Sequence, residues 1–222
     1  MKGLVRSMFG WLFKKKEKVK EQVMGQKLTD EEIHEIAKQF GLKYAHVKAI
    51  FTVEAGGKSG FLAEDPKIPV TLEEGHIFYK YLKQKGKDVE QIAKQYPTIC
   101  YPKWTKAHYK RGLEEYNRYL LAKSVNEECA MLATSWGMGQ LMGFNYKAAG
   151  YSTVKAFVEA MYISEKNQLL AMCSFIAANK GMYDALVTEN WAKFAKLYNG
   201  PEYAVNKYDE KLKKAFEKYK NL

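Results

Sequence analysis

One stretch of the chain, residues 56–73, interrupts an otherwise helical pattern and so limits the folds that this sequence can adopt. It holds three glycines, two prolines and a short alternating apolar run, namely Gly56, Gly57, Gly60, Pro66, Pro69 and Ile68, Val70, Leu72. Glycine and proline mark turns, and alternation of apolar residues is typical of a strand. We therefore expect a mainly α fold with one small β or irregular excursion.

Helix start signals and apolar periodicity place the helices. The clearest start is a capping box, in which Glu32 follows Thr29 by three residues before an apolar run that ends at Phe40. Further helices are predicted at 44–54, 74–82, 89–96, 105–121, 127–134, 152–161, 164–178, 191–197 and 203–219. In the 105–121 helix the periodicity predicts that Tyr109, Leu113, Tyr116 and Leu120 are buried. No repeat or low-complexity linker divides residues 26–222, which are expected to form one domain.

Residues 1–25 differ from this domain in composition. Four apolar residues recur at helical spacing and five lysines follow them: Leu4, Met8, Trp11, Leu12 and Lys14, Lys15, Lys16, Lys18, Lys20. The apolar run is short, Arg6 interrupts it, and no small-residue cleavage site follows, so it is a poor secretory signal. We predict a basic amphipathic segment that contacts an anionic membrane surface. The alternative, a further helix that docks onto the domain, stays open.

The composition narrows the classes of function. Lys and Arg exceed Asp and Glu by 36 − 25 = 11, so a polyanionic partner is favoured. The positive charge is spread along the chain and mixed with acidic residues, and no nucleic-acid motif is present. A non-enzymatic membrane or nucleic-acid binder therefore ranks below an enzyme. Cys100, Cys129 and Cys173 lie far apart without a nearby histidine, which argues against disulfides and zinc. We expect buried thiols, no metal or other cofactor, and a monomer.

Three stretches carry polar groups suited to one catalytic site. In the first, Glu54 ends an apolar helix, where desolvation would raise its pKa and keep it protonated for general acid catalysis. A glutamate that simply points to solvent is the alternative. In the second, residues 134–142, Gln140 follows two glycines and needs a polar partner, either a sugar acetamido group or the Glu54 carboxyl. In the third, Tyr198 and Asn199 precede a Gly-Pro break.

Taken in order, these stretches resemble the lysozyme superfamily. A helix-terminal glutamate, then Ser-x-Gly-x-x-Gln, then Tyr-Asn-Gly is the pattern of goose-type lysozymes and soluble lytic transglycosylases. The resemblance is closer to the N-acetylmuramidase domain of phage endolysins and spans about residue 28 to the C-terminus. Its blocks are residues 53–61, 74–79, 101–104, 134–137, 142–146 and 198–201. Two departures are Met138-Gly139 before Gln140 and the additional Glu73.

The resemblance implies a lysozyme-like α+β domain that cuts β-1,4 bonds between N-acetylmuramic acid and N-acetylglucosamine in peptidoglycan glycan strands. It also implies accumulation in the host cytoplasm and release to the periplasm and cell wall at lysis. Glu54 would be the general acid. The second carboxylate is open between Glu74, which could also be a partner of His76, and Asp65 acting with Thr71. The expected substrate-binding residues are Gln140, Ser135, Tyr198, Asn199, His76 and Thr71. A protein with the same fold could instead act as a lytic transglycosylase, whose reaction needs only one carboxylate.

Overall fold

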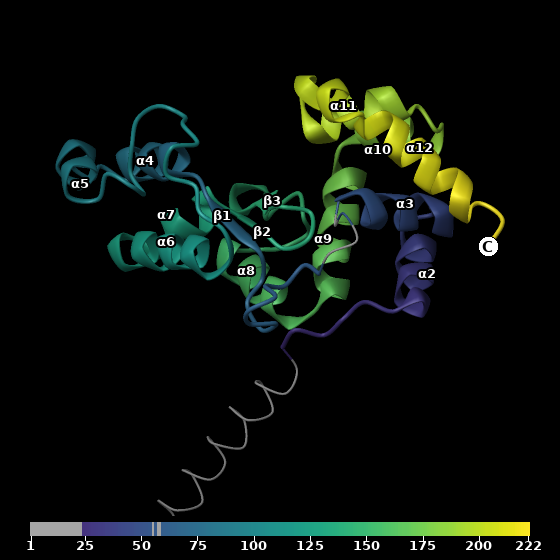
Figure 1. Ribbon diagram of the computed structural model, residues 1–222, viewed down its shortest axis with the longest axis horizontal. Coiled ribbons are helices and arrows are strands. Elements are labelled where there is room, and N and C mark those ends of the chain that lie inside the picture. Colours follow the sequence, from purple (N-terminus) through teal and green to yellow (C-terminus); the bar gives the residue numbers. More distant parts are fainter. Residues whose placement is uncertain (1–23, 55, 57–58) are drawn as a thin grey trace, which may run out of the picture.

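The computed structural model of this protein describes residues 24–54, 56 and 59–222. Helices form most of this part of the chain, which confirms the mainly α fold predicted from the sequence (Figure 1). The helices are α2 (Asp30–Gln39), α3 (Tyr44–Glu54), α4 (Gly75–Gln84), α5 (Val89–Gln95), α6 (Gly112–Val125), α7 (Glu127–Ala133), α8 (Val154–Ile163), α9 (Glu165–Ala178), α10 (Lys180–Val187), α11 (Trp191–Asn199) and α12 (Tyr208–Tyr219), with short 3-10 helices η1 (Gly143–Asn145) and η2 (Pro201–Asn206). The predicted membrane-contacting segment, residues 1–25, lies outside the described residues except for its last two and stays a prediction.

A small antiparallel sheet follows the helix that ends at Glu54. Its strands are β1 (Thr71–Glu73), β2 (Thr134–Trp136) and β3 (Leu141–Met142), in the order β1-β2-β3. Thr71 pairs with Trp136 and Glu73 with Thr134 across the first pair of strands. The sequence placed β1 within the predicted excursion but not the β2–β3 hairpin, because strands of two or three residues are too short to show alternation.

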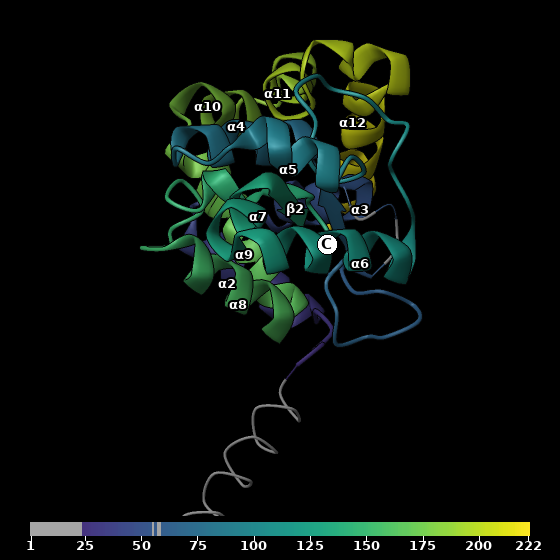
Figure 2. The ribbon, with the colours of Figure 1, turned by 90° about the vertical axis from the view of Figure 1, so that its left-hand side faces the viewer.

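Two groups of buried apolar side chains share α9 between them. The first group joins α9 to α2, α3 and α10–α12, and it includes Ile50, Leu169 and Phe194. The second joins the sheet to α4–α8 and includes Phe78 and Trp136. Figure 1 shows α9 between the two groups of elements, and in the view turned by 90° the C-terminal helices still lie at the top and α8 at the bottom (Figure 2).

The prediction for residues 105–121 was wrong in its start and in its buried face. Helix α6 begins at Gly112, which has a φ of +55°, and residues 105–111 form a loop. The expected core residues Leu113 and Leu120 are 39% and 41% exposed. The face that is buried carries Glu115 and Arg118, among other residues. A charged pair on the inner face of a helix cannot be read from hydrophobic periodicity, which explains the error.

Arg118 is the centre of this buried polar network. Its guanidinium contacts the Glu73 carboxylate at 2.8 Å and the Glu115 carboxylate at 2.6 Å, and it donates to the Thr98 carbonyl oxygen at 2.8 Å. Glu115 also accepts from the backbone N–H of Glu73 at 2.9 Å and of Lys110 at 2.7 Å. The network therefore ties α6 to β1 and to both ends of the loop that precedes α6.

The C-terminal region also departs from the prediction. Helix α10 was not predicted, although Asn179 caps it by accepting from the Met182 N–H at 3.1 Å. The helix expected at 203–219 begins at Tyr208, because η2 occupies residues 201–206. The three cysteines are buried and free, as expected. No helix in the described ranges is both long enough and apolar enough to cross a bilayer.

Glu165, in the first turn of α9, holds two distant segments of chain. Its carboxylate accepts from the Leu28 N–H at 3.0 Å, the Gly60 N–H at 3.1 Å and the Ser59 hydroxyl at 2.7 Å. Burial alone would raise the pKa of Glu165, but these hydrogen bonds outweigh burial and hold the pKa below its usual value. The loop that follows Glu54 is thereby fixed to α9.

Gln168, one turn further along α9, extends this attachment to the hairpin. Its side-chain oxygen accepts from the Met138 N–H at 2.9 Å, and its nitrogen donates to the carbonyl oxygens of Gly60 and Met161. A Cβ at Gly60 would lie 1.8 Å from the Gln168 oxygen, so glycine is required there. The loop after Glu54 and the β2–β3 turn thus meet on one side chain.

We predict that Glu165→Gln lowers the free energy of unfolding by about 2–3 kcal/mol at pH 7, because an amide N–H would face donors that now bind a carboxylate. The folded-state pKa of Glu165 is lowered, so its stabilisation is present above the unfolded-state pKa and is lost as the pH falls. The difference between wild type and variant should therefore shrink below about pH 4. Urea unfolding at the two pH values measures it.

Glu35→Gln is the matched control, because Glu35 makes an exposed ion pair with Lys166, the neighbour of Glu165 on α9. Such a pair contributes at most about 1 kcal/mol. Equal stability of Glu165→Gln and wild type at pH 7 would contradict the role given to Glu165.

Candidate active site

Glu54 is the last residue of α3 and lies in largely apolar surroundings. The helix buries Val47 and Ile50 completely and packs against α12 and α2. Burial raises the pKa of Glu54 to about 7, and a hydrogen bond from Asn199 opposes that rise. The carboxyl group therefore holds a proton near neutral pH, as the sequence analysis expected for a residue at this helix end.

Asn199, at the end of α11, is the polar partner of Glu54. Its Nδ2 lies 3.3 and 3.4 Å from the two carboxyl oxygens, so one amide group faces both of them. Helix α11 ends here because Gly200 follows with a φ of +86°, a conformation that favours glycine. The structure thus brings together two predicted site residues that are 145 positions apart in the chain.

Two buried polar atoms beside Glu54 have no hydrogen-bond partner among the described residues. They are the Tyr198 hydroxyl and the Asn199 Oδ1. Burial raises the pKa of Tyr198, and the Glu54 charge raises it further, which places the two groups close together. Buried polar groups are normally paired, so these two atoms are exceptions in the described part of the chain, and substrate binding by Tyr198 and Asn199 stays a prediction.

The charge of Glu54 also affects Tyr208, a residue that the sequence analysis did not select. It opens α12 and is half-buried, and its pKa is raised by burial and then by the Glu54 charge. The sequence prediction placed this tyrosine inside a longer helix, where nothing distinguished it from the many other tyrosines. Its position near Glu54 depends on the packing of α12 against α3.

The hydrogen-bond partners of Gln140 lie in and beside the β2–β3 hairpin and not at Glu54. Its amide nitrogen donates to the Gly137 and Val70 carbonyl oxygens at 2.8 and 3.2 Å, and its oxygen accepts from the Ser135 hydroxyl at 2.9 Å. These bonds stabilise its φ of +45° and close the β2–β3 turn. The two glycines before it approach α9, since a Cβ at Gly137 would lie 2.6 Å from the Gln168 side chain. Substrate binding by Gln140 and Ser135 stays a prediction.

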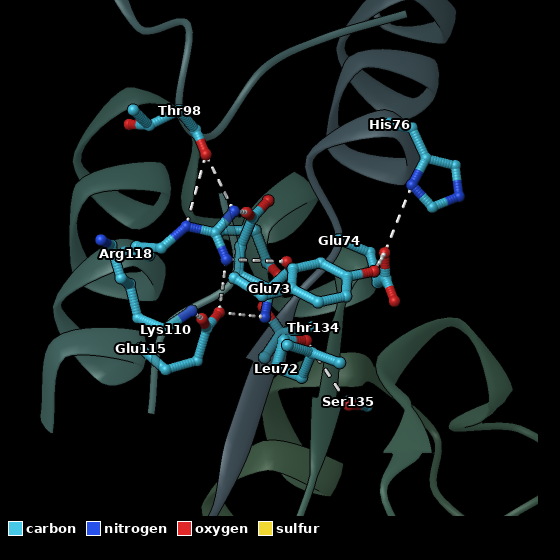
Figure 3. Close-up of polar contacts among 12 residues, drawn as sticks. Leu72, Glu73, Glu74, His76, Thr98, Lys110, Glu115, Arg118, Thr134 and Ser135 are labelled. Atoms are coloured by element: carbon cyan, nitrogen blue, oxygen red, sulfur yellow. Dashed lines mark hydrogen bonds and ion pairs between the residues drawn. The ribbon is translucent and has the colours of Figure 1, made fainter. Parts of the chain in front are cut away.

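Glu74 is held at the start of α4 by two side chains. The Tyr109 hydroxyl donates to its carboxylate at 2.7 Å, and His76 Nδ1 lies 3.3 Å from the same oxygen. The Glu74 side chain is 16% exposed. Figure 3 shows Glu74 and His76 on one side of the strand end and Glu73 with Arg118 on the other. Successive residues point in opposite directions at this strand end, so Glu73 is buried while Glu74 is not.

The other two sequence candidates lie in different surroundings. Asp65 stabilises the turn in which it lies. Its carboxylate accepts from the Lys67 N–H at 3.0 Å, and its backbone carbonyl oxygen accepts from the Ile68 N–H. Thr71, in β1, is buried, and its hydroxyl has no hydrogen-bond partner among the described residues. Trp136, in the predicted stretch 134–142, is 1% exposed and belongs to the second group of buried apolar residues.

Comparison with known proteins confirms the resemblance that was inferred from the sequence. The family described as N-acetylmuramidase matches residues 43–220. Among solved structures, the crystal structure of the Burkholderia AP3 phage endolysin is 42% identical in sequence, with a TM-score of 0.81. The match covers 89% of this chain and 73% of that chain. No curated protein matches this chain. The chain therefore belongs to the N-acetylmuramidase family and is a glycoside hydrolase of the muramidase type, with peptidoglycan as its substrate.

Proposed function

We propose that this protein acts as a phage endolysin at the cell wall and hydrolyses the β-1,4 bond between N-acetylmuramic acid and N-acetylglucosamine, with Glu54 as general acid. The observation that carries this proposal is the partly buried Glu54 carboxyl, whose pKa of about 7 leaves a large share of it protonated at neutral pH. A protonated carboxyl can donate to the departing glycosidic oxygen as the bond breaks.

Glu74 is the second carboxylate of the proposed mechanism. The Tyr109 hydroxyl and His76 fix the orientation of its side chain, as a nucleophile or a water-activating base requires. Asp65 is the weaker candidate, because its carboxylate already caps a backbone N–H in its own turn. A retaining path places the two carboxyl groups about 5–5.5 Å apart and an inverting path about 6.5–9.5 Å apart.

Substrate binding is proposed for the polar atoms near these carboxyls. The Asn199 Oδ1 would accept from a sugar acetamido N–H, and the Tyr198 and Thr71 hydroxyls would donate to sugar oxygens. Gln140 keeps an exposed face on its hairpin, and Ser135 holds the Gln140 amide in place. His76 would act through Glu74.

Glu54→Gln should reduce the initial rate of peptidoglycan lysis by at least about 10²-fold, because the only general acid is lost. The folded-state pKa of Glu54 is raised, so the wild type loses stability relative to the variant as the pH rises from about 4.5 through about 7. The variant should melt at a higher temperature than the wild type at about pH 8 and at a similar temperature at about pH 4.

Glu202→Gln, an exposed change in η2, is the control and should lyse like the wild type. Product masses complete the test, since hydrolysis gives reducing muramic acid ends and a transglycosylase gives anhydro ends. More than a tenth of wild-type activity in Glu54→Gln would remove Glu54 from the acid role.

Asn199→Ala should shift the alkaline limb of the pH profile to higher pH. The Asn199 hydrogen bond lowers the Glu54 pKa against the larger effect of burial, so its loss lets that pKa rise. The limb is measured from initial rates at subsaturating peptidoglycan, which report the free enzyme. Lys196→Ala, an exposed change on the same helix, should leave the limb in place. An unmoved limb in Asn199→Ala would contradict the proposed coupling.

Glu74→Gln should cost far more rate than Asp65→Asn, because only Glu74 is oriented by a tyrosine and a histidine. Tyr109→Phe, which removes the hydroxyl donor but keeps the ring, should give an intermediate loss. The reverse order of the two carboxylate variants would assign the base to Asp65. Small losses in both, together with anhydro products, would indicate the single-carboxylate transglycosylase.

A further inference from the structure

Trp104 is the most exposed of the tryptophans that the structure describes. Its side chain is 58% exposed, whereas Trp136 and Trp191 are 1% and 8% exposed. It lies in the loop between α5 and α6. Figure 1 shows this loop beside α4 and α5. Single exposed apolar residues are common on protein surfaces, so the meaning of an exposed Trp104 depends on what surrounds it.

The position of the Trp104 loop is set by contacts on both sides of the tryptophan. On one side, Tyr101 is buried and packs against the His108 ring at a centroid distance of 5.0 Å. On the other, Tyr109 donates to Glu74, and Arg118 lies 5.9 Å from the Tyr109 ring centroid. The exposed indole is therefore carried on an anchored segment.

Trp104 is also adjacent to the candidate active site. Burial raises the pKa of Tyr109, the hydrogen bond to Glu74 raises it further, and the Trp104 indole N–H opposes the shift. Trp104 lies five positions before Tyr109 on the same anchored loop, and the Tyr109 hydroxyl donates to Glu74 at 2.7 Å. A polymer that reaches Glu74 would therefore pass close to this loop.

The charged residues that lie near Trp104 in the sequence are all basic. Between Glu90 and Glu114 no acidic residue occurs, while four exposed basic residues lie close to the tryptophan: Lys103, Lys106, Lys110 and Arg111. The Lys106 ammonium lies 5.5 Å from the Trp104 ring centroid. None of the four forms a side-chain ion pair with another described residue. Their charge is available to an anionic ligand.

We propose that residues 103–111 form a substrate-binding subsite in which a sugar ring of the glycan strand stacks on Trp104 and the basic side chains bind carboxylates of the attached peptide stem. This subsite rests on the proposed peptidoglycan hydrolase function and extends it to the peptide-bearing part of the substrate. The face of an indole is electron-rich and attracts the C–H groups of a sugar, as it attracts the Lys106 ammonium here. The peptide stems of peptidoglycan supply the negative charge.

The test measures binding in the Glu54→Gln background by pelleting with purified peptidoglycan at low temperature. Trp104→Ala should weaken binding about tenfold, the size expected for loss of a tryptophan anchor, and Trp104→Phe should retain most of the affinity. Leu120→Ala, a change at an exposed apolar residue on α6, should bind like the parent. Melting temperatures should be unchanged, because the altered side chains are exposed.

Glycan strands stripped of peptides by an amidase separate the two parts of the subsite. Trp104→Ala should weaken binding to intact and stripped strands alike. Stripped strands keep the lactyl carboxylate of muramic acid but lose the carboxylates of the peptide. The double variant Lys103→Gln/Lys106→Gln should therefore weaken binding to intact peptidoglycan more than to stripped strands, and its effect should fade at 1 M salt, where the Debye length is about 3 Å.

Equal binding of Trp104→Ala and the parent would overturn the proposal. So would a loss seen only in kcat in the active enzyme, which would leave Trp104 as a support for Tyr109. Because binding is measured without turnover, failure of the Glu54 assignment would show as residual lysis by Glu54→Gln. It would not change the comparison of the Trp104 variants.

Discussion

The attachment of α9 to the loops on both of its sides is the interaction on which the arrangement of this protein depends. Glu165 and Gln168 are buried polar side chains, and each bonds to backbone groups from segments far apart in sequence. The loop after Glu54 is bonded to both of them, while the β2–β3 turn is bonded to Gln168. Apolar packing alone would hold the helices together without fixing these loops, because it has no direction.

The pKa of Glu54 follows from the fixed positions of the helices around it. Helix α3 brings the carboxyl into apolar surroundings, and α11 supplies one amide to it. Burial raises the Glu54 pKa and the amide hydrogen bond lowers it, so the value near 7 is a balance between two opposed effects. Without burial the carboxyl would be ionised at neutral pH, whereas without the amide it would stay protonated to a higher pH.

Glu73 and Glu74, at the end of β1, have different surroundings. Glu73 points into the protein, where its carboxylate lies 2.8 Å from the Arg118 guanidinium. Glu74 points the other way, to Tyr109 and His76. A buried ion pair is costly to break, so the network around Arg118 fixes β1, and β1 in turn fixes where Glu74 begins α4. The additional glutamate noticed in the sequence has a structural role.

The sequence by itself determined the mainly α class, the glutamate at the end of α3 and the tyrosine and asparagine before Gly200. These depend on signals that are local in the chain: a capping box, an apolar period and a glycine that ends a helix. For the same reason most helix starts were located correctly, including those at Asp30, Glu127 and Glu165.

Only the tertiary structure decided what each polar side chain binds. Gln140 contacts its own hairpin, Asn199 contacts Glu54, and the inner face of α6 carries Arg118, whose partners include the distant Glu73. Spacing in sequence gives no distance between such groups. Residues 105–111, which follow Trp104, were predicted as helix because their periodicity fits one. In the structure the Lys110 N–H donates to Glu115, and Arg118 binds both Glu115 and the distant Glu73, which stabilises a loop there. These buried polar contacts outweighed local helix preference.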